Sequence, residues 1–316
     1  MSKRMLLSLV LALVALGTSV RAGEIVYLTP SLDVPFWRYL LKGIESEAEK
    51  AGFTVTAYDS TNDAARQLSN AQDAISRKVD GILISPTDSS TAPRILQMAE
   101  QAGIPVIIAD IGTDSGNYVS FIISDNFEGA HQVGMEAVRL FKEKGMDKPD
   151  VGQVSLSLAR ANGQKRAGGW RKAMEEIGAV EVDLKQMQLY TAEETFKYVQ
   201  DMLTANPNIN ALFVHADSPS VGAVRAIQTS RMGSRVMLFG FDGMPEFIDY
   251  IRDGKLLAVG MQQPYLMGVE SGKTMLQHLK GEQVPKEVMV PIILVSNANL
   301  DAVLPTITLT VFGGEL

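Results

Sequence analysis

Short runs of apolar residues alternate along this chain with longer segments in which apolar residues recur at helical spacing. The first run, residues 25–28, predicts a buried strand, and the chain then turns before Pro35. Proline is favoured at the first position of a helix, and the helical spacing that follows continues as far as Gly52. The turn therefore brings Phe36 and Trp37 to the carboxyl end of a strand.

The same alternation repeats about every 25–30 residues, which is typical of βαβ units. In the first part we expect strands at 25–28, 54–58, 81–84, 106–109 and 118–123, and helices at 36–51, 63–77, 93–102 and 128–144. After a connector at 145–150 we expect strands at 153–158, 184–189, 211–214, 236–239 and 257–261, and helices at 166–177, 193–203, 221–229 and 246–253. Two similar α/β halves in tandem are the simplest account.

The C-terminal part does not fit a simple end to the second half. Residues 265–279 predict a helix, 288–295 a strand, and 306–311 form a last apolar run. We expect one of these segments to cross back to the first half. The chain would then form two lobes joined by more than one strand.

The first 22 residues have the pattern of a secretory signal peptide. Lys3 and Arg4 precede an apolar run, and Ala22 stands at the expected cleavage position. No later run reaches the roughly 20 apolar residues that a transmembrane helix needs. The chain has no Cys, which excludes disulfides, a thiolate nucleophile, a zinc–thiolate site and a lipid-bearing Cys. We therefore expect a soluble protein that is exported.

The charge of the chain argues against nucleic acid as a partner. The formal net charge is −7, and loss of the three basic residues of the leader lowers it to −10. Phosphate backbones repel such a protein, and no basic helix or stripe is present. We expect no nucleic-acid binding.

Polar side chains follow several of the expected strands in both halves. They are Asp110, Asp217, Asp242 and Gln262. Carboxylates accept hydrogen bonds from vicinal hydroxyls, and an amide both donates and accepts. An Asp after a strand is also a common turn former or helix cap. The recurrence in both halves favours a polyhydroxylated ligand at the carboxyl ends of the strands, where open α/β sheets bind ligands.

Arg166 and three aromatic residues extend this candidate site. Arg166 is expected to open a helix, where a cation opposes the helix dipole, so a planar donor fork aimed into a cleft explains it better. Phe36 and Trp37 either staple the helix start to the core or face the cleft. Adjacent residues do not share a helix face, so we expect one of the two to face the cleft. Tyr190 would lie on the opposite wall.

Signals for catalysis are poor. The chain has three His, and His215 with Asp217 is the one place where a proton-transfer pair fits. No catalytic or phosphate-binding motif and no cluster of metal ligands is present. We expect no cofactor, no metal site and no enzymatic activity.

Ten segments, read in order, resemble the ribose-type periplasmic sugar-binding proteins. They are LDVPFW, ILISPTDSS, VIIAD, ISDN, KRAGGW, LTANPNINALF, ADSPSVGAVRAIQ, GFDGMPE, DGKLLAVGMQQP and MGVESGKTMLQHLKGE. The sugar repressors share the fold but begin with a helix-turn-helix, where this chain has its leader. The resemblance implies a type 1 periplasmic binding protein: two Rossmann-like lobes with parallel-sheet cores and a three-strand hinge.

The resemblance also implies boundaries and partners. The lobes would comprise residues 23–125 plus 263–291 and 126–262 plus 292–316, with hinges near 124–126, 262–264 and 290–292. A monomer would close on a monosaccharide or polyol and deliver it to an ABC permease. The alternative is an adaptor that reports a less polar small signal to a sensor kinase or chemoreceptor, and a gene neighbourhood would separate the two.

Residue roles carry over at matching positions. Phe36 and Trp37 resemble the aromatic pair that holds the sugar from the first lobe, and Tyr190 the aromatic that faces them. Four further residues match hydroxyl-binding positions: Asp110, Arg166, Asp242 and Gln262.

Three positions depart from the ribose-type pattern. Val34 replaces an Asn, Ile111 an Arg, and Ala216, next to Asp217, another Asn. A site built to pair a ligand hydroxyl rejects a mismatched ligand strongly. We therefore expect a ligand other than ribose: a polyol, a deoxy or methylated sugar, or a less polar signal molecule.

Overall fold

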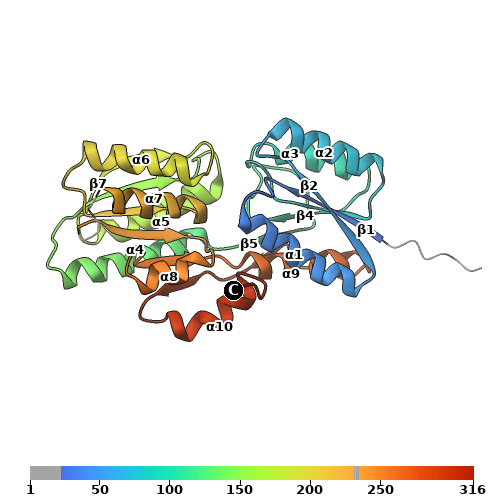
Figure 1. Ribbon diagram of the computed structural model, residues 1–316. Helices are drawn as coiled ribbons and strands as arrows, with labels where there is room; N and C mark the ends of the chain where they lie inside the picture. The colour runs from blue at the N-terminus through green and yellow to red at the C-terminus, as the bar shows by residue number, and fades with distance from the viewer. Residues whose placement is uncertain (1–22, 231, 233–234) are drawn as a thin grey trace, which may run out of the picture.

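The computed structural model describes residues 23–230, 232 and 235–316, which form two α/β lobes side by side (Figure 1). The predicted signal peptide, residues 1–22, lies outside the described residues. Each lobe is built on one six-stranded sheet. The predicted fold class, two α/β lobes with mainly parallel sheets, is confirmed. No helix in the described part of the chain is long and apolar enough to cross a membrane.

The sheet of the first lobe is parallel throughout and has the order β11-β5-β4-β3-β1-β2. Its strands are β1 (Gly23–Thr29), β2 (Phe53–Asp59), β3 (Gly81–Ile84), β4 (Val106–Ala109), β5 (Ser120–Ile123) and β11 (Glu287–Met289). The helices around it are α1 (Pro35–Lys50), α2 (Ala64–Ser76), α3 (Ala92–Gln101) and α9 (Pro264–Leu279). The elements expected from 25 to 123 are confirmed, with ends that differ by one or two residues.

The sheet of the second lobe has the order β12-β10-β9-β8-β6-β7, and β12 pairs antiparallel with β10. Its strands are β6 (Asp150–Ser155), β7 (Val180–Gln186), β8 (Ala211–Val214), β9 (Met237–Phe241), β10 (Ala258–Met261) and β12 (Ile293–Ser296). The helices of this lobe are α4 (Asn126–Glu143), α5 (Ala161–Glu175), α6 (Ala192–Ala205), α7 (Asp217–Thr229), α8 (Glu246–Arg252) and α10 (Leu300–Thr310).

Two strands and two helices in the second lobe were predicted too late. β6 begins at Asp150 rather than 153, and β7 begins at Val180 rather than 184. α5 begins at Ala161 rather than 166, and α7 begins at Asp217 rather than 221. Both first turns are polar and lack apolar periodicity, so the hydrophobic pattern became visible only one turn later. Arg166 therefore lies in the second turn of α5 and does not open the helix.

The chain passes between the lobes at three places: between β5 and α4, between β10 and α9, and between β11 and β12. The prediction of one strand over 288–295 is wrong, because this stretch contains two short strands in different sheets. Pro291 lies between them and has no N–H to donate to a sheet. The apolar run at 306–311 belongs mainly to α10.

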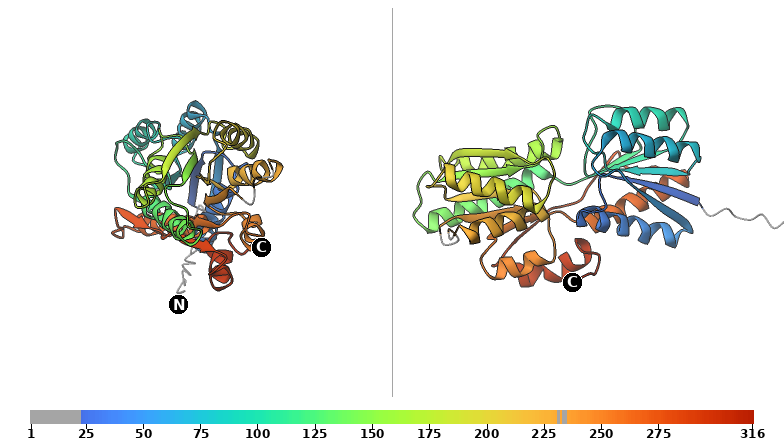
Figure 2. Two further views of the ribbon diagram at one scale, coloured as in Figure 1. Left: turned by 90° about the vertical axis from the view of Figure 1, so that its left-hand side faces the viewer. Right: turned by 45° about the horizontal axis from the view of Figure 1, so that its top comes forward.

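The C-terminal segment makes a further contact between the lobes. α10 follows β12 of the second lobe and lies beneath the junction of the two lobes (Figure 2). The ring of Phe312 packs edge-on against Tyr39 of α1, with centroids 5.9 Å apart. Lys42, also on α1, donates to the Gly313 carbonyl at 2.9 Å and pairs with Glu315 at 2.7 Å. One end of this segment is therefore held by each lobe.

Buried apolar side chains fill both faces of the two sheets in four clusters. Helices α1 and α9 pack closely because Gly43 and Gly268 lie at their crossing. A Cβ at Gly43 would fall 2.1 Å from the Tyr265 carbonyl oxygen, and one at Gly268 would fall 2.0 Å from that of Leu40. This close packing fixes the position of α1, whose first turn forms one wall of the site.

Candidate ligand-binding site

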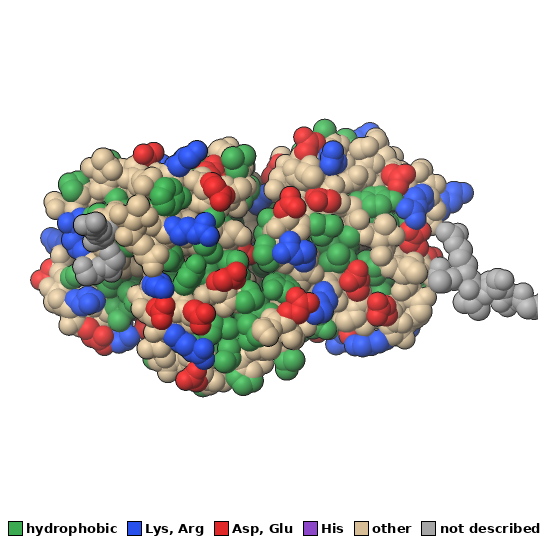
Figure 3. Space-filling view, viewed as in Figure 1, with side chains coloured by type: hydrophobic (Ala, Val, Ile, Leu, Met, Phe, Trp, Pro, Cys, Tyr) green, Lys and Arg blue, Asp and Glu red, His purple; other side chains and the backbone are tan. Residues whose placement is uncertain are grey.

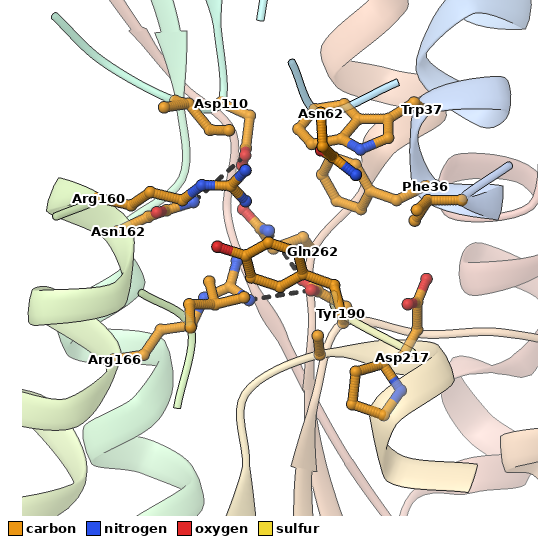
Figure 4. A pocket seen from close by; sticks show the side chains of 16 residues that line it. Phe36, Trp37, Asn62, Asp110, Arg160, Asn162, Arg166, Tyr190, Asp217 and Gln262 are labelled. Carbon is orange, nitrogen blue, oxygen red and sulfur yellow. Dashed lines mark hydrogen bonds and ion pairs between the residues drawn. The ribbon is translucent and has the colours of Figure 1, made fainter. Parts of the chain in front are cut away.

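A pocket lies between the lobes, at the carboxyl ends of several strands (Figure 4). The structure brings together all eleven residues predicted from the sequence: Val34, Phe36, Trp37, Asp110, Ile111, Arg166, Tyr190, Ala216, Asp217, Asp242 and Gln262. Five further residues line it: Asn62, Leu156, Arg160, Asn162 and Pro219. The three positions that depart from the ribose-type pattern therefore face the same space as the polar residues.

The aromatic wall of the first lobe is formed by the start of α1. Pro35 occupies its first turn, and the rings of Phe36 and Trp37 meet edge to face with centroids 4.8 Å apart. The helix-face argument placed one of them at the cleft and the resemblance placed both there, and in the structure both line the pocket. Both also belong to the buried cluster beneath α1. Since the helix begins at the edge of the pocket, both side chains of its first turn reach it.

Tyr190 lies across the pocket from Phe36 and Trp37, as predicted (Figure 4). It follows β7, and its ring carries the guanidinium of Arg160 on one face at 4.5 Å. Aromatic residues from both lobes therefore border the space in which a ring-shaped ligand would sit.

A buried polar network occupies the floor of the pocket in the second lobe. Nη1 of Arg166 pairs with Oδ2 of Asp242 at 2.9 Å, and Nε2 of Gln262 donates to its Oδ1 at 2.8 Å. Nε of Arg166 donates to Oδ1 of Asn126 at 2.7 Å, and its guanidinium lies 4.1 Å from the Phe241 ring. Two nitrogens of Arg166 are therefore occupied within the protein, Nε by Asn126 and Nη1 by Asp242, and less of its donor fork is free for a ligand than expected.

Asp110 has a different environment. It is 3% exposed, and the one hydrogen bond described for its carboxylate comes from Nδ2 of Asn162 at 3.3 Å, across the cleft. Burial raises the pKa of the Asp110 carboxyl to about 6, although the charge of Arg166 opposes the shift. A buried carboxylate with so little compensation would gain from a ligand that donates hydrogen bonds.

Asp217 is the first residue of α7, where the helix dipole favours a negative charge. Its Oδ1 accepts from the Ser218 N–H at 2.6 Å. Burial, and next the charge of Asp242, nevertheless raise the pKa of Asp217 to about 7. Asp217 is not the cap of this helix, because Ala216 occupies the N-cap position and no side chain caps it. The capping role considered for an Asp after a strand is therefore absent here, and Asp217 lies in the pocket wall.

Three buried acceptor atoms of the pocket have no hydrogen-bond partner among the described residues. They are Oδ1 of Asp110, Oδ2 of Asp217 and Oε1 of Gln262. Leaving a buried polar atom without a partner costs about 1–3 kcal/mol. Three such atoms around one pocket indicate a ligand that donates at least three hydrogen bonds.

The backbone is also unusual at this site. Seven non-glycine residues among those described have a positive φ, and four of these line the pocket. The four φ values are 56° for Asn62, 63° for Asp110, 58° for Tyr190 and 64° for Asp242. Asn and Asp tolerate this conformation, but Tyr does so rarely. Such strain concentrates at functional sites, where the surrounding structure holds it in place.

The residues that sequence reasoning missed fall into two groups. Asn62 follows β2, and Arg160 and Asn162 follow β6, so polar residues after these strands carried the same signal as Asp110 and Asp242. Leu156 and Pro219 are apolar, and no sequence signal distinguishes them from core residues.

The alternative of a proton-transfer pair at His215 is not supported by the geometry. Its ring is fully buried, and Nε2 lies 2.8 Å from Oε1 of Gln153 rather than near Asp217. Burial, reinforced by the charge of Arg166, lowers the pKa of His215 well below its usual value, so the ring is neutral. Within the ranges that the structure covers, no group of His, Asp and Glu could hold a metal ion.

Comparison with known proteins shows which family has this sequence and fold. Residues 25–283 match the model of the periplasmic binding protein domain. The ribose import binding protein of Escherichia coli K12 is 34% identical over 300 residues, covering 93% of this chain and 99% of that protein. The D-apiose import binding protein of Actinobacillus succinogenes is 28% identical, covering 92% and 94%.

Solved structures have the same fold. A carbohydrate transporter solute-binding protein from Agrobacterium radiobacter, in complex with D-arabinose, has a TM-score of 0.85 at 24% identity, covering 93% of this chain and 100% of that chain. A myo-inositol-binding protein from Caulobacter has a TM-score of 0.83 at 21% identity, covering 90% and 96%. With two lobes, a pocket between them and these relatives, the chain belongs to the periplasmic binding protein family, in the group that contains the ribose import binding proteins.

Proposed function

We propose that this protein captures a monosaccharide or polyol in the periplasm, between its two lobes, and delivers it to an ABC permease. The observation that carries the proposal is the set of three unpartnered acceptors, on Asp110, Asp217 and Gln262, in a pocket bordered by aromatic rings. Hydroxyl groups donate to such acceptors, and the C–H faces of a sugar ring pack on Phe36, Trp37 and Tyr190. The names of the relatives, which are import binding proteins for ribose and D-apiose, support this class of ligand.

The members of this family bind solutes and are not enzymes. An enzymatic role for the pair His215 and Asp217 is therefore set aside. Delivery to a permease is favoured over signalling because the relatives are named for import. Figure 3 shows acidic and basic side chains interspersed over one face, which fits a partner other than nucleic acid. We further propose that the protein is a monomer, and that a chemoreceptor or sensor kinase is at most an additional partner.

We propose the lobe boundaries given by the resemblance, residues 23–125 plus 263–291 and 126–262 plus 292–316. The membership of the strands supports them, because β11 belongs to the first sheet and β12 to the second. The hinges would then lie near 124–126, 262–264 and 290–292. Nε2 of Gln263 donates to the Pro291 carbonyl at 2.7 Å, which ties two of these passages together.

The ligand is expected to present C–H or methyl groups to Val34, Ile111 and Ala216, and hydroxyls to the acidic residues. A thermal-shift screen of the ligand-stripped mature protein would identify it, with D-ribose, D-apiose, D-arabinose, myo-inositol, deoxy sugars and methylated sugars as probes. A ligand at about 100 times its Kd adds roughly 2.7 kcal/mol of stability, or about 5–11 °C for a chain of this size. Amino acids and dicarboxylates serve as controls. A shift with these and none with any carbohydrate or polyol would overturn the proposal.

A further inference from the structure

Two side chains at the start of α5 reach across the cleft from the second lobe to the first. Nε of Arg160 donates to the Thr87 carbonyl oxygen at 3.0 Å, and Nδ2 of Asn162 donates to Oδ2 of Asp110 at 3.3 Å. Thr87 follows β3, and Asp110 follows β4. Both Arg160 and Asn162 line the pocket. These contacts therefore join the lobes at the site where a ligand would bind.

Arg160 is in an unfavourable place for a cation. It is 7% exposed, and it occupies the N-cap position of α5, where the helix dipole disfavours a positive charge. Burial lowers the pKa of its guanidinium. In the described part of the chain, no carboxylate forms an ion pair with it, whereas Arg166 pairs with Asp242. Its charge is offset only by groups without an ion-pair contact, chiefly Tyr190, Asp110 and Asp88. A buried cation that lacks an ion pair is costly, so a purely structural role explains Arg160 poorly.

The guanidinium of Arg160 extends into the pocket close to Asp110 (Figure 4). One face of it lies 4.5 Å from the centroid of Tyr190, which fixes its plane. Its Nε is used by Thr87, and neither terminal nitrogen has a hydrogen-bond partner among the described residues. Donors without partners and Oδ1 of Asp110, an acceptor without a partner, thus belong to residues that line the same pocket. A hydroxyl group donates and accepts at once, so two neighbouring hydroxyls satisfy both groups.

We propose that Arg160 couples ligand binding to closure of the lobes, by binding hydroxyl oxygens of the ligand through its terminal nitrogens while Nε holds the Thr87 carbonyl of the opposite lobe. The inference rests on the proposed function and specifies its substrate class. The ligand carries a pair of vicinal hydroxyls that bridges Asp110 and Arg160. Loss of either hydroxyl leaves one of these buried groups unpaired.

The test compares R160M and R160K with K165M. Lys165 lies on the same helix and is exposed, so K165M makes the same change of charge outside the pocket. Affinity is measured by calorimetry, and dissociation by stopped-flow, with whichever of D-ribose, D-apiose, D-arabinose and myo-inositol binds the wild type most tightly. We expect R160M to weaken binding about 10- to 100-fold, mainly through faster dissociation, and R160K to weaken it less. K165M should stay within about twofold of the wild type.

Closure is measured separately, with spin labels at S69C on α2 and K197C on α6. Both positions are exposed, they lie on different lobes, and the chain has no other Cys to label. Saturating ligand should shorten the distance between the labels in the wild type and in K165M, and leave a larger open fraction in R160M. The thermal midpoint of ligand-free R160M should equal or exceed that of the wild type, because the substitution removes a buried cation that lacks an ion pair. If Arg160 had only a structural role, its replacement would lower the midpoint.

The outcomes distinguish the two proposals. If the wild type binds no carbohydrate or polyol of the thermal-shift screen, the proposed function fails, and this inference fails with it. If the wild type binds, but R160M matches K165M in affinity and closure, only the role of Arg160 is overturned. A ligand-free midpoint of R160M that falls while affinity stays unchanged would also overturn it.

Discussion

Asp110 and Asp242 occupy equivalent places in the two lobes and have opposite surroundings. Each follows the strand that lies third in its sheet, β4 in one lobe and β9 in the other. Each has a left-handed backbone, with φ of 63° and 64°, and each donates its N–H to the next strand at 2.9 Å. The backbone therefore repeats almost unchanged between the lobes.

The side chains differ in how far the protein itself satisfies them. Arg166 and Gln262 bind both oxygens of Asp242, whereas Asp110 has one long hydrogen bond, from the opposite lobe. The second lobe thus holds its half of the site ready before ligand arrives. The first lobe contributes a carboxylate whose partners come from the ligand and from closure. This asymmetry predicts that the two carboxylates respond differently to substitution.

Replacing Asp242 should have the largest effect, on both stability and binding. D242A leaves Arg166 as a buried cation without its partner, which costs about 3–5 kcal/mol, or roughly 6–20 °C in thermal midpoint. Binding of the sugar identified by the screen should become undetectable. Calorimetry and thermal denaturation measure both, with D147A, at an exposed carboxylate, as the control. If D242A had the same thermal midpoint as the wild type, burial of Arg166 would not require its ion pair with Asp242.

Replacing Asp110 should affect binding alone. D110N keeps the shape but removes the charge that accepts from the ligand, so affinity should fall about 10- to 100-fold. The midpoint of the ligand-free protein should stay the same or rise, because a poorly compensated buried charge is removed. If D110N lowered the ligand-free midpoint as much as D242A, the asymmetry between the lobes would be refuted.

The smallest expected effect is the pH dependence. The pKa of Asp110 is about 6 and that of Asp217 about 7 in the folded protein, both above the unfolded value of 3.8. The folded state therefore binds more protons, and these two groups make the ligand-free protein more stable as pH falls from about 7 towards 4. Hydroxyl donors favour the ionised carboxylate, so protonation of Asp110 alone should make affinity about tenfold weaker at pH 5 than at pH 7.

Thermal denaturation and calorimetry from pH 4.5 to about 8 measure this dependence, with the double variant D110N/D217N as the reference. The stability gain on acidification should be smaller in the double variant than in the wild type. If stability depended on pH equally in the wild type and in the double variant, neither carboxyl would have a raised pKa.

Most of the fold could be predicted because the hydrophobic periodicity of parallel strands and their helices is local. The pattern failed where local signals are weak, at the polar first turns of α5 and α7 and at the short strands on either side of Pro291. Within the pocket, strand ends identified Asp110, Asp242 and Gln262 because topology alone brings them together.

What the sequence did not reveal is how the polar groups share their hydrogen bonds. Nothing in the chain order indicates that Arg166 is occupied by Asp242 while Arg160 reaches the other lobe. Those assignments depend on distances between residues that are far apart in sequence. The roles of Phe36 and Trp37 were likewise predicted as alternatives, although in the structure the two residues both pack in the core and line the pocket.

The left-handed backbone at Asn62, Asp110, Tyr190 and Asp242 also divides the pocket into positions that accept new side chains and positions that do not. Most residues would be strained at these four, so random substitution there mainly yields damaged proteins. Val34, Ile111 and Ala216 have negative φ or ordinary backbone and face the same space. A mutant library that varies only these three should yield new ligand preferences from intact proteins, so this site is easier to retune at its apolar positions than at its polar ones.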